Sequence, residues 1–429
     1  MRIEPAVSVQ GDIAVPGVKG ISQRAVLLAA VADGESTIRG FGRAADTEAA
    51  IAAVRALGVE VAEDDVDVLR VQGVGLRGLT PFEGVIDCGN AGTVMRLLTG
   101  LLAGQRGSFE LTGDESLSKR PQERVAEPLR RMGAQVETRD GHAPVRIEGA
   151  QLRPIRYELP VASAQVKSAV LFAGLYARGS HTTVIEPVPT RDHTELLLPA
   201  FGARVRRGAH EASVWPVPRL AAVELDIPGD FSAAAPFIVA AALVPGSVVR
   251  AHGVNVNPTR TGLLDVLERM AVPIAVFNRR RVHGELVADV EVRSAERQLQ
   301  AATIEPAEVP LLVDELPLFA LAAGLARGES IVRGAQELRV KESDRIETVT
   351  SALRSVGIRI QARDDGFSVR GVPTRPVGGR IDPAGDHRIA MLGAVAGLVS
   401  RDGVELEDAE CVAISFPGFF DLLDSVTRR

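Results

Sequence analysis

Six polar clusters in the sequence each stand at the start of an apolar stretch rich in small residues. The stretches have the length and composition of buried helices, and a helix N-terminus offers unpaired N–H groups and a partial positive charge. The clusters hold mainly Lys, Arg, Ser and Gln with a few acids, a set suited to binding a small polyanionic substrate. The expected helices are 21–32, 90–104, 163–177, 231–244, 314–326 and 386–400.

Two clusters bring carboxylates to positions where a carboxylate is costly. Asp314 and Glu315 enter the apolar run LLVDELPLFALAAGLA, and acids facing a core are tolerated only when they are paired or functional. The run RVKESDR (339–345) precedes another helix, a pattern that alone would suit an exposed helix start. In GDHR (385–388), charged residues again stand directly before an apolar helix. Together these groups favour acid–base chemistry on an anion.

The first half of the chain supplies mostly cations and amides. These candidates are Lys19, Arg24, Arg96, Lys119, Arg120, Ser163, Gln165, Lys167 and Arg191. The segment DCGNAG (87–92) lacks the GKS/T ending of a Walker A loop, and the motifs HExxH, CxxC and GxSxG do not occur. The sequence therefore indicates an anion-binding site without a metal or a protein nucleophile.

The helix starts recur at intervals of 68 to 83 residues, which is longer than a solenoid repeat. In most copies a strand follows, and then a second helix that ends at a glycine, as in AIAAVRALG (50–58) and TVTSALRSVG (348–357). The copy LLDVLERMA (263–271) has alanine at that position. The pattern predicts six small α/β modules.

Pro-Gly turns at 16–17 and 228–229 each precede a repeat helix, and we place the domain crossovers there. The first three-repeat domain would be 20–225, and the second would be 1–19 plus 226–429. Two crossing strands would form a hinge, and the cleft between the domains would hold the ligands.

Composition excludes several classes of protein. Of 429 residues 46% are hydrophobic and only 4% aromatic, and the net charge is −6, so a nucleic-acid binder is not expected. The apolar runs are too short for a membrane span, and the N-terminus has no signal-peptide pattern. With only two cysteines, Cys88 and Cys411, we expect buried thiols in a cytoplasmic protein. We expect a monomer.

The motifs together resemble those of the 3-phosphoshikimate 1-carboxyvinyltransferase (EPSP synthase) family over essentially the whole chain. The carriers are CGNAGTVMR, LTGDESLSKRP, SAQVKSAVLFAGL, IPGD, VDELP, RVKESDR, GDHRIAM and SFPGFF. The resemblance implies two similar α/β domains of the inside-out barrel type, each with three βαβαββ repeats. It also implies transfer of the enolpyruvyl group of phosphoenolpyruvate to the 5-hydroxyl of shikimate 3-phosphate, by addition and then elimination of phosphate, without a cofactor. That reaction belongs to chorismate and aromatic amino acid biosynthesis.

The resemblance also implies roles for individual residues. Asp314, Glu342 and Lys19 match the catalytic positions, with Asp314 as the proton acceptor near the 5-hydroxyl and Glu342 as the carboxyl group for proton transfer at C3. The phosphoenolpyruvate ligands would be Lys19, Gly92, Arg120, Gln165, Arg345 and Arg388. The shikimate 3-phosphate ligands would be Lys19, Arg24, Ser163, Ala164, Gln165, Arg191, Asp314 and Lys341.

The sequence departs from the family pattern at a few positions. Gly20 stands where the family usually has a serine that contacts shikimate 3-phosphate, and Ile414 stands where one bacterial type has a lysine. Ala164 and Arg191 match a bacterial subgroup that is often less sensitive to glyphosate, whereas Gly92 is the small residue linked to sensitivity.

Two other functions fit parts of the pattern. A sister family transfers the same group to UDP-N-acetylglucosamine, but it has Lys-Asn near the N-terminus and a cysteine in the loop that corresponds to 111–121. Neither feature occurs here. A non-catalytic anion-binding descendant is suggested only by Gly20 and Ile414, and the retained acids and cations speak against it.

Overall fold

The computed structural model describes residues 1–429, and the chain divides into two units. Unit 1 comprises Met1–Pro16, Pro228–Arg280 and Leu286–Arg429, and unit 2 comprises Gly17–Ile227 and Arg281–Glu285. The chain therefore passes between them at the two Pro-Gly turns, and the tip of one hairpin also groups with unit 2.

Unit 2 is built around three buried helices, α1 (Lys19–Ala30), α3 (Gly92–Leu102) and α6 (Ala164–Gly174). Helices α3 and α6 approach so closely that a Cβ at Gly100 would lie 2.3 Å from the carbonyl oxygen of Ala169. The outer helices are α2 (Ala45–Ala56), α4 (Glu115–Ser118), α5 (Glu123–Met132) and α7 (His193–Leu197). Small residues on the inner helices thus permit a tightly packed centre.

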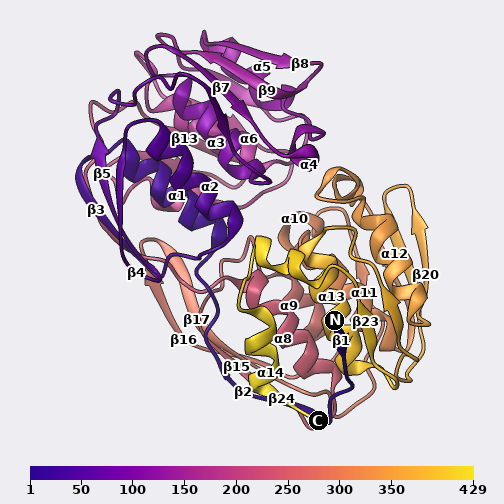
Figure 1. Cartoon of the computed structure of the whole chain (residues 1–429). Helices are drawn as coiled ribbons and strands as arrows, with labels where there is room; N and C mark the ends of the chain where they lie inside the picture. Colours follow the sequence, from indigo (N-terminus) through magenta and orange to yellow (C-terminus); the bar gives the residue numbers. More distant parts are fainter. The chain divides into compact units, whose positions relative to one another are not determined.

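Three four-stranded sheets belong to unit 2 (Figure 1). The first has the order β14 (Glu224–Asp226), β3 (Asp33–Arg39), β5 (Val68–Val74), β4 (Glu60–Asp65). The second has the order β6 (Val85–Asp87), β7 (Ser108–Thr112), β9 (His142–Glu148), β8 (Gln135–Arg139). The third has the order β10 (Arg156–Glu158), β11 (Thr182–Ile185), β13 (Glu211–Val214), β12 (Val205–Arg207).

Unit 1 repeats this plan with the inner helices α8 (Phe231–Leu243), α11 (Leu316–Leu325) and α13 (His387–Val399). The remaining helices are α9 (Gly262–Arg269), α10 (Val309–Leu312), α12 (Arg345–Ser355) and α14 (Phe419–Val426), with the 3₁₀ segments η1 (Gln336–Val340) and η2 (Ala409–Ile414). The structure therefore confirms all six predicted inner helices, with ends that differ by a few residues.

Unit 1 also has three sheets (Figure 1). One has the order β1 (Arg2–Ile3), β23 (Val404–Leu406), β22 (Gly379–Ile381). Another has the order β16 (Ile274–Val282), β17 (Glu285–Arg293), β15 (Val248–Asn255), β2 (Ser8–Ile13), β24 (Thr427–Arg428). The third has the order β18 (Thr303–Ile304), β19 (Gly328–Val332), β21 (Gly366–Gly371), β20 (Arg359–Arg363).

Every sheet contains one parallel pair of strands, and the pairs explain how the units are connected. In four sheets an inner helix joins the two parallel strands, as α3 joins β6 and β7. In the other two sheets the partners are exchanged. Strand β2 precedes α1 but pairs with β15, and β14 precedes α8 but pairs with β3. At each crossover, the strand just before the connection thus pairs within the unit from which the chain departs.

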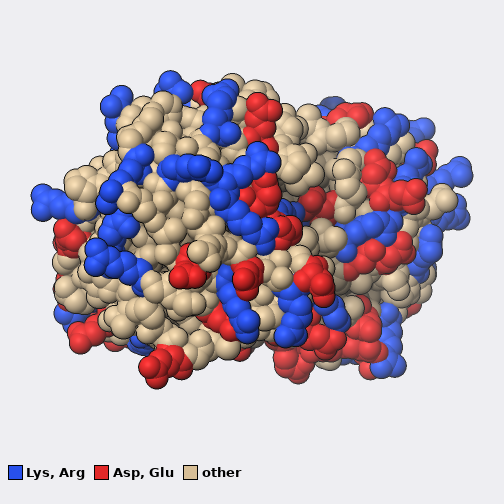
Figure 2. Space-filling view, turned by 90° about the horizontal axis from the view of Figure 1, so that it is seen from above, with Lys and Arg blue, Asp and Glu red and all other residues tan.

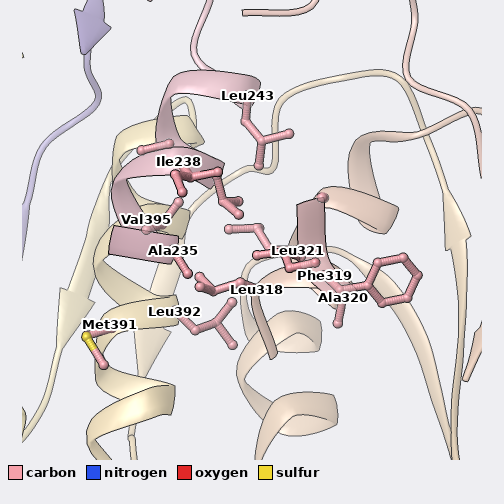
Figure 3. Close-up of a cluster of buried hydrophobic side chains, with 14 of the residues drawn as sticks. Ala235, Ile238, Leu243, Leu318, Phe319, Ala320, Leu321, Met391, Leu392 and Val395 are labelled. Atoms are coloured by element: carbon pink, nitrogen blue, oxygen red, sulfur yellow. The ribbon is translucent and has the colours of Figure 1, made fainter. Parts of the chain in front are cut away.

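The inner helices are covered by one another and by the sheets. Nearly all sides of each helix are therefore apolar. All 13 residues of α8 are buried, and the hydrophobic core of unit 1 includes residues of all three inner helices. Figure 3 shows the side chains of α8, α11 and α13 meeting, with Leu318, Leu321 and Leu392 between the helices. Their N-terminal residues are therefore held at fixed positions by a rigid core.

Several outer helices end at the glycines that the sequence predicted. Gly58, Gly133 and Gly357 each adopt a left-handed conformation just after a helix. Ala271 occupies the same position after α9, with φ of 71°. A side chain at this φ is strained, because the left-handed region crowds Cβ against the following carbonyl oxygen.

On the face drawn in Figure 2, Lys and Arg side chains occur together with Asp and Glu side chains, and neither sign covers the face. No helix in the chain combines the length and apolar character needed to cross a membrane.

Candidate active site

In unit 2, Gln165 lies among polar side chains at the starts of α3 and α6. Its amide nitrogen Nε2 donates to Thr93 Oγ1 at 2.8 Å, and its carbonyl oxygen accepts a hydrogen bond from Arg96. Arg96 is 4% exposed and also donates to the carbonyl oxygen of Pro121 at 3.3 Å. Because both ends of the amide are occupied, the orientation of Gln165 is defined by its neighbours.

Arg120 follows the short helix α4 and reaches the same region. Its Nη2 donates to Asn90 Oδ1 at 2.6 Å and to Ser116 Oγ at 3.1 Å. A Cβ on Gly92, the first residue of α3, would lie 3.4 Å from Nη1 of Arg120 and 3.3 Å from Nη1 of Arg96. The absence of a side chain at position 92 therefore leaves room for both guanidinium groups beside a helix N-terminus.

Lys19 and Arg24 lie on α1 and have different surroundings. Lys19 Nζ is 2.6 Å from Asp46 Oδ2, and their side chains are 22% and 10% exposed. Arg24 is 3% exposed and donates to the carbonyl oxygen of Gly20 at 2.7 Å, Thr194 Oγ1 at 2.7 Å and Ser168 Oγ at 2.9 Å. Both cations are thus fixed by partners from other elements.

The remaining candidates of unit 2 lie at the ends of α6 and α7. Ser163 caps α6 by accepting a hydrogen bond from the amide of Val166 at 3.4 Å, and Ala164 is the first residue of that helix. Arg191 is half-buried in the segment just before α7. The structure therefore brings Gly92, Arg120 and Gln165 into one group around α3, whereas Arg24 belongs to a second group around α7.

In unit 1, three carboxylates surround the guanidinium of Arg345, the first residue of α12. Its Nη1 lies 3.2 Å from Asp314 Oδ1, and its Nη2 lies 2.6 Å from Glu342 Oε2. Its Nε lies 2.8 Å from Asp386 Oδ2. Arg345 is 1% exposed, and burial by itself would lower its pKa, but the carboxylates of Asp386, Glu342 and Asp314 raise the pKa instead.

Arg388 lies in the first turn of α13, directly after that cluster. Its backbone amide donates to Asp386 Oδ1 at 2.9 Å, and its Nη1 donates to the carbonyl oxygen of Ser232 at 3.3 Å. Lys341 is half-buried between η1 and α12. The helix starts of α12 and α13 thus place Arg345, Arg388 and two of the predicted catalytic acids within one region.

Sequence reasoning gave no role to several buried polar residues beside this region. Glu315 is 1% exposed and accepts a hydrogen bond from Ser232 Oγ, which in turn accepts one from Arg260. Burial raises the pKa of Glu315. The signal in the sequence was the pair of consecutive acids in DELP. Only the fold shows that Asp314 contacts Arg345, whereas Glu315 contacts Ser232.

The two cysteines and Ile414 are also placed. Burial raises the pKa of Cys88 and of Cys411 to about 12, so both thiols remain protonated near neutral pH and are poor nucleophiles. Ile414 is half-buried and packs against the hydrophobic core of unit 1. Its side chain therefore contributes to packing, where one bacterial type would have a cation.

The sequence matches the EPSP synthase (3-phosphoshikimate 1-carboxyvinyltransferase) family over residues 3–423. A 3-phosphoshikimate 1-carboxyvinyltransferase of Acidithiobacillus ferrooxidans is 48% identical over 417 residues, which cover 97% of this chain and 95% of the relative. The enzyme of the same name from Citrifermentans bemidjiense is 46% identical over 429 residues, covering 100% and 99%.

Solved structures give the same result. The EPSP synthase of Acinetobacter baumannii superposes with a TM-score of 0.88 at 40% identity, covering 99% of this chain and 98% of that one. The enolpyruvyl transferase NikO of Streptomyces tendae has a TM-score of 0.80 at 19% identity, covering 99% and 96%, and so shares the fold. The two-domain inside-out α/β fold is thus confirmed, and the chain belongs to the EPSP synthase family of 3-phosphoshikimate 1-carboxyvinyltransferases.

Proposed function

We propose that the residues grouped at these helix starts bind phosphoenolpyruvate and shikimate 3-phosphate and catalyse the reaction of the family. The reaction moves the enolpyruvyl group of phosphoenolpyruvate to the 5-hydroxyl of shikimate 3-phosphate and releases phosphate. Family membership supports the overall reaction. Motif matches, together with the hydrogen bonds and ion pairs at the helix starts, support the roles of individual residues.

The observation that carries the proposal is the set of carboxylates on Arg345. Asp314 and Glu342, the two candidate proton-transfer groups, both contact this one buried guanidinium. A buried arginine surrounded by acids is costly for stability unless all the charges are compensated, and such a cluster is common at functional sites. The acids therefore compete with the anion of phosphoenolpyruvate for this cation.

Phosphoenolpyruvate carries a phosphate and a carboxylate, and both are recognised well by the planar fork of a guanidinium group. Arg120, Arg345 and Arg388 are the candidate forks. The remaining ligands in the proposal are Lys19, Gly92 and Gln165. Gly92 contributes by absence of a side chain, since the space beside it holds two guanidinium groups.

Shikimate 3-phosphate would be bound by a mixed set of cations and neutral donors. Its phosphate would meet the start of α6, where Ser163, Ala164 and Gln165 lie beside a partial positive charge. Arg24, Arg191, Lys19 and Lys341 would add positive charge, and Asp314 would accept a hydrogen bond from the 5-hydroxyl.

The proton transfers follow from these positions. Asp314 takes the proton of the 5-hydroxyl as its oxygen bonds to C2 of phosphoenolpyruvate, and Glu342 delivers a proton to C3, which forms a tetrahedral intermediate with a methyl group. Glu342 then takes a proton back from that methyl group as phosphate leaves C2, which restores the double bond, and the proton held by Asp314 passes to the departing phosphate. Lys19 stabilises the charge on the leaving phosphate. No group beyond the two substrates is consumed.

Release of phosphate from purified protein tests this function. Phosphoenolpyruvate would be supplied with shikimate 3-phosphate or, in parallel, with UDP-N-acetylglucosamine. We expect release only with shikimate 3-phosphate. Release only with the nucleotide sugar would assign the chain to the sister reaction, and release with neither would favour the non-catalytic descendant.

A further inference from the structure

Unit 2 contains a fully buried lysine that the proposed reaction does not use. Lys167 is 1% exposed, and its Nζ lies 2.8 Å from Glu186 Oε1 and 2.8 Å from Glu195 Oε1. Burial by itself would lower the pKa of Lys167, but the two carboxylates raise it. A buried cation with two buried acids has a high desolvation cost, so a role beyond filling space is expected.

The triad of Lys167, Glu186 and Glu195 connects three segments of the chain. Lys167 lies one turn into α6, directly after the proposed substrate residues Ser163 to Gln165. Glu186 follows β11, and Glu195 lies in α7. The segment between Glu186 and α7 contains Arg191, a proposed ligand of shikimate 3-phosphate.

The triad also holds that segment from within. Lys167 Nζ donates to the carbonyl oxygen of Thr190 at 3.4 Å, and Thr190 Oγ1 donates to Glu186 Oε2. Thr190 is 6% exposed and immediately precedes Arg191. The backbone at the base of Arg191 is therefore fixed by the lysine and by one of its carboxylates.

Two residues next to the triad in the sequence form hydrogen bonds with Arg24, the second proposed ligand of the phosphate. Ser168 follows Lys167, and Thr194 precedes Glu195; Thr194 Oγ1 donates to Ser168 Oγ at 2.7 Å. Both hydroxyls accept hydrogen bonds from the guanidinium of Arg24. Residues of α6 and α7 thus bind the side chain of Arg24, and Lys167 of α6 also binds the backbone next to Arg191.

We propose that Lys167, with Glu186 and Glu195, is a positioning cluster that sets Arg24 and Arg191 for the phosphate of shikimate 3-phosphate. The inference rests on the proposed function and deepens it. It predicts a selective effect: disturbing the cluster weakens the use of shikimate 3-phosphate and leaves the use of phosphoenolpyruvate nearly unchanged, because Arg120 is held by Asn90 and Ser116.

The charge balance decides which variants are informative. Glu195 is 3% exposed, and its second oxygen has no hydrogen-bond partner. Lys167→Met alone would leave two buried carboxylates without a cation, which would unfold many proteins. Lys167→Met combined with Glu186→Gln and Glu195→Gln removes all three charges together. Thr190→Val keeps every charge and removes the hydroxyl that donates to Glu186, whereas the backbone carbonyl of residue 190 can still accept from Lys167.

The experiment measures KM for each substrate, with the other saturating, in the full-length wild type, Thr190→Val and the triple variant. Binding of shikimate 3-phosphate alone would be measured by calorimetry. Loss of one hydrogen bond in Thr190→Val should raise KM for shikimate 3-phosphate about 3- to 10-fold, and KM for phosphoenolpyruvate should change by less than about 2-fold. Arg70→Met is the control, since it removes an exposed ion pair with Asp64 in the same unit and should change neither KM.

The outcomes separate the two proposals. A wild type that releases no phosphate contradicts the proposed function. A wild type that is active, with both KM values unchanged in Thr190→Val and only a lower Tm, contradicts the positioning role, because a purely structural cluster alters the amount of folded enzyme and not its affinity. Equal increases of both KM values contradict it as well. If the triple variant fails to fold, Thr190→Val still decides.

Discussion

The carboxylate of Asp314 lies 3.2 Å from the guanidinium of Arg345, a residue that is 1% exposed. The candidate base and the candidate anion ligand therefore form an ion pair with each other. A substrate anion must compete with Asp314 and Glu342 for the same cation.

Asp314→Ala should leave the fold intact and lower kcat by about 10²- to 10⁴-fold, the usual contribution of a general base. Because the substitution removes a competitor for Arg345, KM for phosphoenolpyruvate should not increase. Steady-state phosphate release gives both constants, and circular dichroism checks the fold. Turnover close to that of the wild type would remove Asp314 from the mechanism.

Gly20→Ser should improve the use of shikimate 3-phosphate. A Cβ at position 20 would have its nearest neighbour at 3.4 Å, the Nη1 atom of Arg24, which is an ordinary contact distance. The serine hydroxyl would supply an additional hydrogen-bond donor beside Arg24, and one hydrogen bond to a charged group changes affinity about 10-fold or more. KM for shikimate 3-phosphate is the readout, and Gly20→Ala is the matched control. Equal KM values for the serine and alanine variants would contradict the prediction.

Ala271→Gly should stabilise the protein. Ala271 has φ of 71°, where a residue with a side chain is strained. Relief of that strain, less the extra entropy of glycine in the unfolded chain, should raise the free energy of unfolding by about 0.5–1 kcal/mol. Gly357→Ala, at the corresponding stop with φ of 92°, should destabilise it. Urea unfolding of both variants tests the pair, and a fall in stability for Ala271→Gly would refute the argument.

Stability should also depend on the protonation of His252. A hydrogen bond to Asp12 raises the pKa of His252, and Asp289 adds to the effect; the distances from the ring nitrogens are 2.7 and 3.4 Å. Because the folded-state pKa is above 6.5, the contribution is fully present below pH 6.5 and is lost as the pH rises through the folded-state pKa.

The test compares Tm of the wild type and His252→Gln across this range. The difference between them should be largest below pH 6.5 and shrink at alkaline pH, and it should be modest because the His252 side chain is 44% exposed. Added salt should reduce it further. A difference that is constant with pH would show that His252 contributes through packing alone.

Much of the fold could be predicted from the sequence because its determinants are local. Asp230 and Asp386 cap α8 and α13 through side-chain hydrogen bonds, which is the signal that polar residues before an apolar run provide. The stop at Ala271 was visible because the flanking pattern matched the copies that end in glycine.

What the sequence could not provide are the contacts between distant segments. Arg345 and Asp386 are 41 residues apart, and Arg96 and Gln165 are 69 apart. Lys167 was visible as a candidate, but its two carboxylates belong to a loop and to another helix. The exchange of β2 and β14 between the two sheets likewise depends on pairing across more than 180 residues of chain.

The product formed in D₂O tests the proposed reaction most directly. Addition followed by elimination passes through a methyl group, so deuterium from the solvent should enter the vinyl CH₂ of the product, as mass spectrometry or NMR would show. The wild type should form a deuterated enolpyruvyl ether of shikimate 3-phosphate, and Asp314→Ala should form it far more slowly. Product without deuterium would contradict the proposed proton transfers at C3, and the absence of product would contradict the function itself.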